Sequence, residues 1–131
     1  MQSRILHRTQ TMVALAGVAL LSACVAAAAG AGAAAGIYLT SQGASTTVTA
    51  PLATVDARTQ AVLADMGITV MHREVEDDGI EYHGTGNGMD IAVELDQGDD
   101  GTVKVTASAR KNEVDWDKEY ARTIVQRIAE Q

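Results

Sequence analysis

The chain has one cysteine, one proline and no phenylalanine, and its aromatic residues are three tyrosines and one tryptophan. A single cysteine excludes an internal disulfide, and the scarcity of aromatic side chains means that the core must be built from Val, Ile, Leu, Met and Ala. Basic residues are also few, since 10 Lys and Arg stand against 17 Asp and Glu and give a net charge of −7. Nucleic acids and anionic lipid headgroups attract clustered Lys and Arg, so this acidic balance argues against either as a partner. At 131 residues the chain holds one domain at most.

The only cysteine lies at the end of a targeting pattern. The first residues carry Arg4 and Arg8 and no acid, an apolar run follows over residues 12–21, and two small residues precede Cys24. A basic start, an apolar stretch of this length and a small-residue cleavage site are typical of a secretory signal peptide. We therefore expect residues 1–23 to be a signal peptide.

The sequence Leu21-Ser22-Ala23-Cys24 resembles the bacterial lipobox. This resemblance implies cleavage between Ala23 and Cys24, two acyl chains on the Cys24 sulfur and a third on the new N-terminus. Several acyl chains anchor a protein stably, whereas one chain binds a membrane only marginally. Cleavage would remove Arg4 and Arg8 and no acid, and so would change the net charge from −7 to −9 over the remaining 108 of the 131 residues.

A second interpretation treats residues 12–39 as an uncleaved membrane span, because none of them is charged and about 20 apolar residues suffice to cross a bilayer. The span is the weaker interpretation, since residues 26–36 are all Ala and Gly, which are poor hydrophobes. We interpret residues 24–44 as an Ala/Gly-rich tether.

Beyond residue 45 the chain alternates between strand and helix patterns. Residues 45–49 have the β-propensity of a short edge strand, and a helix is predicted to run from Pro51 to Met66, with Asp56 near its positively polarised first turn and Gly67 ending it. Strands are predicted over residues 68–76, 80–84, 89–95 and 102–110, and a last helix over residues 114–130. Asn112 or Asp115 would cap that helix, and a stripe recurring every four residues would pack against the sheet. This stripe consists of Trp116, Tyr120, Ile124 and Ile128.

Two strand registers follow from gathering apolar side chains on one face. In the first hairpin a three-residue loop over residues 77–79, with Gly79 in a left-handed bulge position, would place Tyr82 on the face of Ile68 and Val70. In the second, Val93 would lie near Val105, and Glu94 would face Lys104.

Strands joined by short turns are antiparallel, and helices on either side of such a meander cover one face of the sheet. The predicted fold is therefore α+β, with an antiparallel four- to five-stranded sheet and two helices packed on one face. Residues 45–131 form this domain, after the signal peptide and the tether.

This order of elements, after a lipobox and an Ala/Gly tract, resembles a family of small bacterial envelope lipoproteins whose domain has no assigned function. The residues that carry the resemblance are Leu21 to Cys24, the Ala/Gly run, the helix end over residues 63–70, the paired strands and the C-terminal helix. Members usually have glycine in the loop before the last helix, and here residues 110–114 contain none. The resemblance implies no catalytic residues and no cofactor.

His72 and His83 could suggest a metal site. In the preferred register they point to opposite faces, with His83 exposed and His72 half-buried beside Tyr82, whereas a two-residue loop at Asp77 and Asp78 would place them opposite each other. A metal site needs a third ligand, and Glu74 or Glu81 could supply it.

The sequence therefore predicts a non-catalytic lipoprotein of the bacterial cell envelope. Its contact with the membrane would be the lipid anchor at Cys24, in the outer rather than the inner membrane, and its domain would face the periplasm. The partner would be an unidentified envelope component bound through an exposed sheet face or edge strand. The alternative is a small periplasmic enzyme or metal-binding protein that uses His72 and His83.

Overall fold

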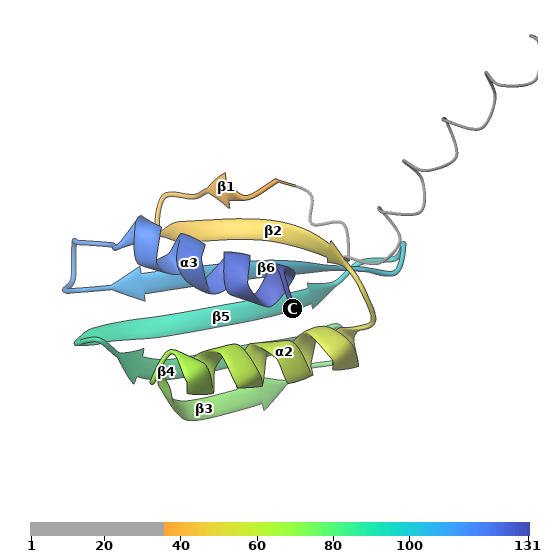
Figure 1. The fold of residues 1–131 in the computed structure, drawn as a ribbon, viewed down its shortest axis with the longest axis horizontal. Helices are drawn as coiled ribbons and strands as arrows, with labels where there is room; N and C mark the ends of the chain where they lie inside the picture. The colour runs from red at the N-terminus through yellow and green to blue at the C-terminus, as the bar shows by residue number, and fades with distance from the viewer. Residues whose placement is uncertain (1–35) are drawn as a thin grey trace, which may run out of the picture. The chain divides into compact units, whose positions relative to one another are not determined.

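Eight helices and strands follow one another in residues 36–131, the part of the chain that the computed structural model describes (Figure 1). In chain order they are β1 (Tyr38–Leu39), β2 (Gly43–Thr49), α2 (Leu52–Asp65), β3 (Thr69–Val75), β4 (Gly79–Gly86), β5 (Met89–Gln97), β6 (Thr102–Arg110) and α3 (Lys118–Ala129). The fold is α+β, as predicted, but its sheet has six strands where four to five were predicted.

Strand β2 lies inside the sheet, not at its edge. The strand order is β1-β2-β6-β5-β4-β3, all neighbours are antiparallel, and β2 pairs with β6 along its whole length. The edge-strand prediction for residues 45–49 was wrong because propensity shows that a strand forms but not which distant strand it pairs with. The sheet also takes in Tyr38–Leu39 and Gly43–Ala44, which the sequence assigned to the tether.

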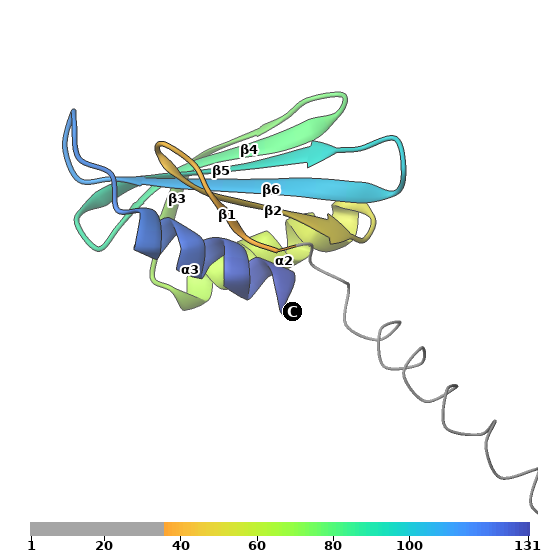
Figure 2. The same cartoon turned by 90° about the horizontal axis from the view of Figure 1, so that it is seen from above.

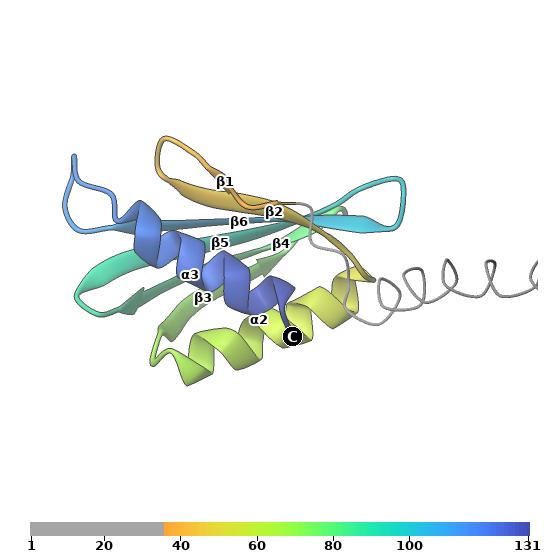
Figure 3. The same ribbon diagram turned by 45° about the horizontal axis from the view of Figure 1, so that its top comes forward.

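Both helices pack on one face of the sheet, which we call the inner face (Figure 2). Helix α3 contacts β2 and β6, helix α2 contacts β3, β5 and β6, and the two helices also touch each other (Figure 3). Alternate side chains of each strand enter the core between these layers. Its largest fully buried side chains are those of Leu63, Tyr82, Leu95, Ile124, Ile128 and seven valines, at positions 48, 55, 62, 93, 103, 105 and 125. The opposite, helix-free side of the sheet is the outer face.

Helix α2, which was predicted from Pro51 to Met66, buries one face in the core. Val55, Thr59 and Val62 are buried at helical spacing, and the Thr59 hydroxyl is satisfied by donating to the Val55 carbonyl at 2.8 Å. Pro51 is the N-cap residue, and Gly67 follows the helix with a left-handed φ of 69°, which glycine adopts without strain.

Asp56 does not act on the first turn of α2, where the sequence placed it. Its carboxylate instead accepts hydrogen bonds from Arg73 Nη2 at 2.8 Å and from the hydroxyl of Tyr82. Arg73 Nε in turn donates to the Tyr82 hydroxyl at 3.0 Å. Burial, and then the hydrogen bond to Asp56, raise the pKa of Tyr82, so the hydroxyl keeps its proton as a donor. We call these three residues the Asp56 clamp, because they join α2 to β3 and β4.

The register between β3 and β4 differs from the preferred prediction. Val75 lies opposite Ile80, and the amide of Glu76 donates to the Gly79 carbonyl at 2.9 Å, which leaves Asp77 and Asp78 as a two-residue loop. Gly79 is not left-handed; it is required because a Cβ there would lie 2.5 Å from the Leu95 carbonyl oxygen.

A bulge in β3 explains why the apolar pattern misled the register prediction. Val70 lies opposite Gly84, but His72 lies opposite His83, so one residue is inserted between the two pairs. The side chains of Ile68, before the bulge, and Arg73, after it, can therefore both point to the inner face. In a regular strand these two side chains would point to opposite faces. Ile68 is buried beside Gly86, where a Cβ would approach Ile68 Cγ1 to 2.7 Å.

The β5–β6 hairpin keeps the predicted inner faces but shifts the predicted pairing by two residues. Leu95, not Val93, lies opposite Val105, and Lys104 faces Asp96 instead of Glu94. A shift of two residues keeps every side chain on its own face, so the alternation of apolar residues could not distinguish the registers.

Helix α3 begins at Lys118, four residues later than predicted. Asp117 is its N-cap and accepts a hydrogen bond from the Tyr120 amide at 2.9 Å, whereas Asn112 accepts from the amides of Val114 and Asp115 in the preceding loop. Trp116 therefore lies outside the helix and forms an isolated bridge with Arg110. The rest of the predicted stripe is confirmed, with Ile124 and Ile128 fully buried.

No helix within residues 36–131 is long and apolar enough to cross a membrane. Tyr38 and Leu39, the end of the alternative span over residues 12–39, form strand β1. The rest of that span, the signal peptide and Cys24 lie outside the described residues.

Gly43→Ala should destabilise the domain by about 1–3 kcal/mol, because a Cβ at this position would lie 1.9 Å from the Ala107 carbonyl oxygen and force β2 away from β6. Gly36→Ala is the matched control, since a Cβ there meets nothing within 4 Å. Urea denaturation of both variants measures the difference, and equal stabilities would contradict the close approach of the two strands.

Asp56→Ala should cost about 1–3 kcal/mol of unfolding free energy, because Arg73 and the buried Tyr82 hydroxyl would lose their shared acceptor. Asp65→Ala, also in α2, is the control: Asp65 pairs with Arg127 at 2.7 Å but its side chain is 74% exposed, against 15% for Asp56. We expect Asp65→Ala to cost under about 1 kcal/mol. Urea denaturation at neutral pH measures the loss of unfolding free energy in both variants. Equal losses would contradict a stabilising role of the Asp56 clamp beyond that of an exposed ion pair.

Candidate functional site

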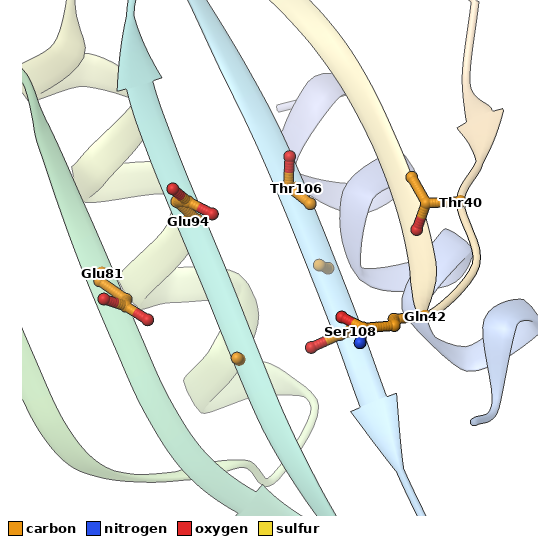
Figure 4. A pocket seen from close by; sticks show the side chains of 8 residues that line it. Thr40, Gln42, Glu81, Glu94, Thr106 and Ser108 are labelled. Atoms are coloured by element: carbon orange, nitrogen blue, oxygen red, sulfur yellow. The ribbon is translucent and has the colours of Figure 1, made fainter. Parts of the chain in front are cut away.

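The outer face carries a polar pocket of about 220 Å³ near the middle of the sheet. Figure 4 shows the helices behind the sheet, with the pocket residues projecting from the opposite side. Glu81, Glu94, Thr106 and Ser108 come from β4, β5 and β6, and the turn between β1 and β2 adds two more polar side chains. These are Thr40 and Gln42.

The pocket is hollow because small residues occupy one row across the sheet. Ala92 of β5 lies opposite Ser108 of β6, and Ser108 lies opposite Gly43 of β2. Position 43 must be glycine because the Ala107 carbonyl lies too close for a Cβ. The same close packing of β2 against β6 therefore leaves this row without a large side chain. The turn that contains Thr40 and Gln42 stands beside the row.

The electrostatics of the pocket are set by two glutamates on neighbouring strands. Glu81 lies directly opposite Glu94, and like charges in that position destabilise a sheet. Glu81 pairs with His83 at 2.7 Å, while Lys104, the nearest base to affect Glu94, lies opposite Asp96. Burial, and then the charges of Asp96 and Glu81, raise the pKa of Glu94. The pocket therefore offers hydrogen-bond acceptors and negative charge to a ligand.

A second, more apolar pocket of about 230 Å³ adjoins the first and shares Ala92 and Ser108 with it. Trp116 forms one wall, and the Arg110 guanidinium lies 5.9 Å from the centre of its ring. We call this the tryptophan pocket. Together the two pockets make a continuous depression with a carboxylate end and an aromatic end.

The two histidines that the sequence singled out lie opposite each other on the outer face. The preferred prediction, which put them on opposite faces with His72 beside Tyr82, was wrong, and the alternative two-residue loop is what forms. Each ring contacts a glutamate two residues away on its own strand. His72 contacts Glu74 at 3.4 Å, and His83 contacts Glu81 at 2.7 Å. Within the described residues, no group of three or more His, Cys, Asp or Glu is arranged to hold a metal ion.

Ser108, His83 and Glu81 resemble a nucleophile, base and orienting acid only in residue type. His83 lies opposite Ala92, and Ala92 lies opposite Ser108, so a whole strand separates the base from the hydroxyl. The backbones of His83 and Ser108 are therefore about 9.6 Å apart. The His83 ring bonds to Glu81, and within the described residues no hydrogen bond joins this ring to the Ser108 hydroxyl.

Sequence reasoning missed most of the outer-face depression. Trp116 was assigned to the apolar stripe of the last helix. The signal that could have corrected this is Asp117, which follows Trp116 and is the N-cap of α3, so that Trp116 precedes the helix. The predicted register of the β5–β6 hairpin, which was shifted by two residues, paired Glu94 with Lys104. Cys24 and Ala23, the predicted modification and cleavage residues, lie outside the described residues.

Residues 8–131 match the family described as "Protein of unknown function (DUF3568)". The chain belongs to this family. The match takes in the segment that contains Cys24 as well as the whole described domain, and it confirms the expectation of a domain without an assigned function. No curated protein matches the chain.

Glu94→Gln should stabilise the domain at neutral pH by about 0.5 kcal/mol, because it removes a partly buried charge that faces Glu81. The raised pKa means that the folded state favours protonated Glu94, so ionisation of this group costs stability as the pH rises through the folded-state value. The advantage of Glu94→Gln should therefore vanish in acid, where the wild-type carboxyl is protonated in both states.

Thermal denaturation between pH 3 and 8 tests this expectation. Glu113→Gln, at an exposed loop position, is the control and should change stability little at any pH. A Glu94→Gln variant that is less stable than wild type at pH 7 would contradict the like-charge pair.

Proposed function

We propose that this protein is a lipoprotein of the bacterial cell envelope, held in the membrane by acyl chains on Cys24, with a non-catalytic binding domain in the periplasm. The observation that carries the proposal is the position of the only cysteine, directly after a basic start, an apolar run and two small residues. The family match supports it, because it joins this segment and the domain in one unit.

The position of the domain along the chain is consistent with an anchor at Cys24. Strand β1 begins at Tyr38, so the 13 residues 25–37 separate the proposed anchor from the sheet. A chain of that length spans at most about 45 Å. An anchor at Cys24 would therefore keep the domain close to the membrane surface.

The outer face supports a binding role for the domain. It combines a carboxylate-lined pocket with the tryptophan pocket, and a surface with both acceptors and an aromatic wall suits a ligand with donor and apolar groups. The His83 ring bonds to Glu81 and, within the described residues, not to the Ser108 hydroxyl, which is consistent with a binding role for this surface.

Intact mass of the membrane-extracted protein tests the anchor. The wild type should have the mass of residues 24–131 plus acyl chains, and Cys24→Ser should keep the leader and gain no acyl mass. Ser22→Ala is the matched control, because one small residue replaces another before the cleavage site and processing should continue. An unmodified full-length wild-type chain would overturn the proposal.

A further inference from the structure

Strand β3 is the longer of the two edge strands of the sheet. It pairs only with β4, and all seven of its residues are exposed, whereas the opposite edge strand β1 has two residues (Figure 1). Unpaired strand edges are templates for another strand, and proteins block them with short strands, Lys, Pro, β-bulges or inward-pointing charged residues. Residues Thr69–Val75 contain neither Lys nor Pro, but they include a bulge between Val70 and His72 and the inward-pointing Arg73, whose charge is paired with Asp56.

The free backbone groups of β3 can be assigned from its hairpin. The Glu76 amide bonds to Gly79 in β4, so by antiparallel alternation Glu74 and His72 also direct their backbone groups toward β4. Arg73 and Val75 therefore direct their N–H and C=O groups away from the sheet. These groups are available to a second strand.

Exposed apolar side chains gather on the same strand. Six large hydrophobic side chains of the described residues are exposed, and three of them belong to β3: Val70 at 41%, Met71 at 74% and Val75 at 62%. A concentration of exposed apolar side chains on one edge strand favours an interaction there.

We propose that β3 pairs antiparallel with β3 of a second copy of this chain, with Arg73 of each copy opposite the other. In this register His72 of one copy faces Glu74 of the second copy, and Met71 faces Val75. An imidazole, which can donate a hydrogen bond, meets a carboxylate, and an apolar side chain meets an apolar one. Each contact occurs twice because the arrangement is two-fold. A register shifted by two residues would instead place Glu74 opposite Glu74.

The two facing arginines do not oppose this pairing, because each is already engaged. Arg73 bonds to Asp56 at 2.8 Å and to Tyr82 at 3.0 Å in its own copy, and these contacts draw the guanidinium over α2 and neutralise its charge. The bulge between Val70 and His72 limits regular pairing to about residues 71–75. The interface is thus short and has one favoured register.

This inference goes beyond the proposed ligand binding by the outer face, because it names a second copy of the chain as a partner at a different surface. Pairing would join the two sheets edge to edge and bring two lipid anchors into one assembly. Two linked anchors hold a protein on a membrane more firmly than one.

Cysteine cross-linking in membranes that carry the full chain tests the register. His72→Cys and Glu74→Cys variants with different tags are co-expressed and oxidised with copper phenanthroline. The two positions would face each other as a non-hydrogen-bonded pair with Cα atoms about 4.5 Å apart, which a disulfide can span. We expect a disulfide between the two variants and at least fivefold less between copies of either variant alone.

Glu113→Cys co-expressed with Val114→Cys controls for random collision, since both positions lie in an exposed loop. Absence of the His72→Cys to Glu74→Cys product, equal yields in every combination, or cross-linking to a different protein would each overturn the inference. The anchor is measured separately by intact mass, so either result can fail without the other.

A charge exchange provides a second test, by sedimentation of the detergent-extracted chain. H72E would place Glu opposite Glu74 twice and should weaken dimerisation about tenfold, and H72E/E74K should restore it. Both side chains are more than half exposed, so the fold should tolerate the changes. A double variant as weak as H72E, or a wild type that stays monomeric at all concentrations, would contradict the pairing.

Discussion

The Asp56 clamp fixes how the far half of the sheet is arranged. A carboxylate of α2 that is only 15% exposed receives both Arg73 and the Tyr82 hydroxyl, so these two side chains must come from β3 and β4 on the inner face. Arg73 and Tyr82 lie directly opposite each other in the hairpin. Because strand side chains alternate, placing this pair inward places the neighbouring pairs, His72 with His83 and Glu74 with Glu81, outward. The charge of the outer face therefore depends on a contact on the inner face.

The other half of the sheet depends on the pairing of β2 with β6. This contact joins strands far apart in the sequence, and it brings the backbone of Gly43 against the Ala107 carbonyl. The turn before β2 then stands above the outer face, where Thr40 and Gln42 complete the polar pocket. The polar pocket thus depends on both halves of the sheet. The Asp56 clamp turns Glu81 and its neighbour Glu94 to the outer face, and the turn before β2 supplies the wall.

Local pattern predicted the elements of this fold well, because alternation in β5 and helical spacing in α2 each reflect one buried face. It could not distinguish between registers that differ by two residues, because both keep the same side chains on each face. Lys104 was therefore paired with Glu94, although it lies opposite Asp96. In β3 it failed for a different reason. Ile68 and Arg73 both serve the inner face only because a bulge intervenes, and a bulge breaks the period of two on which the prediction depends. Placing Arg73 inward also requires its partner on α2, which lies 17 residues earlier in the chain.

The same errors explain why the candidate site was not visible in the sequence. His72 and His83 face each other only in the register that the clamp selects, and Trp116 reaches the outer face only because Asp117, not an earlier residue, caps α3. Each depends on a contact between elements distant in the sequence. By contrast, the pattern around Cys24 is contiguous, so its interpretation needed no knowledge of the fold.

The strand order connects the proposed anchor to the free edge. The chain enters the domain at β1, and β3 is the last strand at the opposite side of the sheet. Five strand spacings, about 24 Å, separate the two edges. The chain therefore enters the described domain at its short edge, and the longer edge strand lies at the opposite side of the sheet. The inner face is covered by helices, whereas the outer face and β3 are exposed surfaces of the described domain that a partner can reach. A contact through β3 would leave both pockets of the outer face open, so pairing between copies and binding of a ligand can occur together.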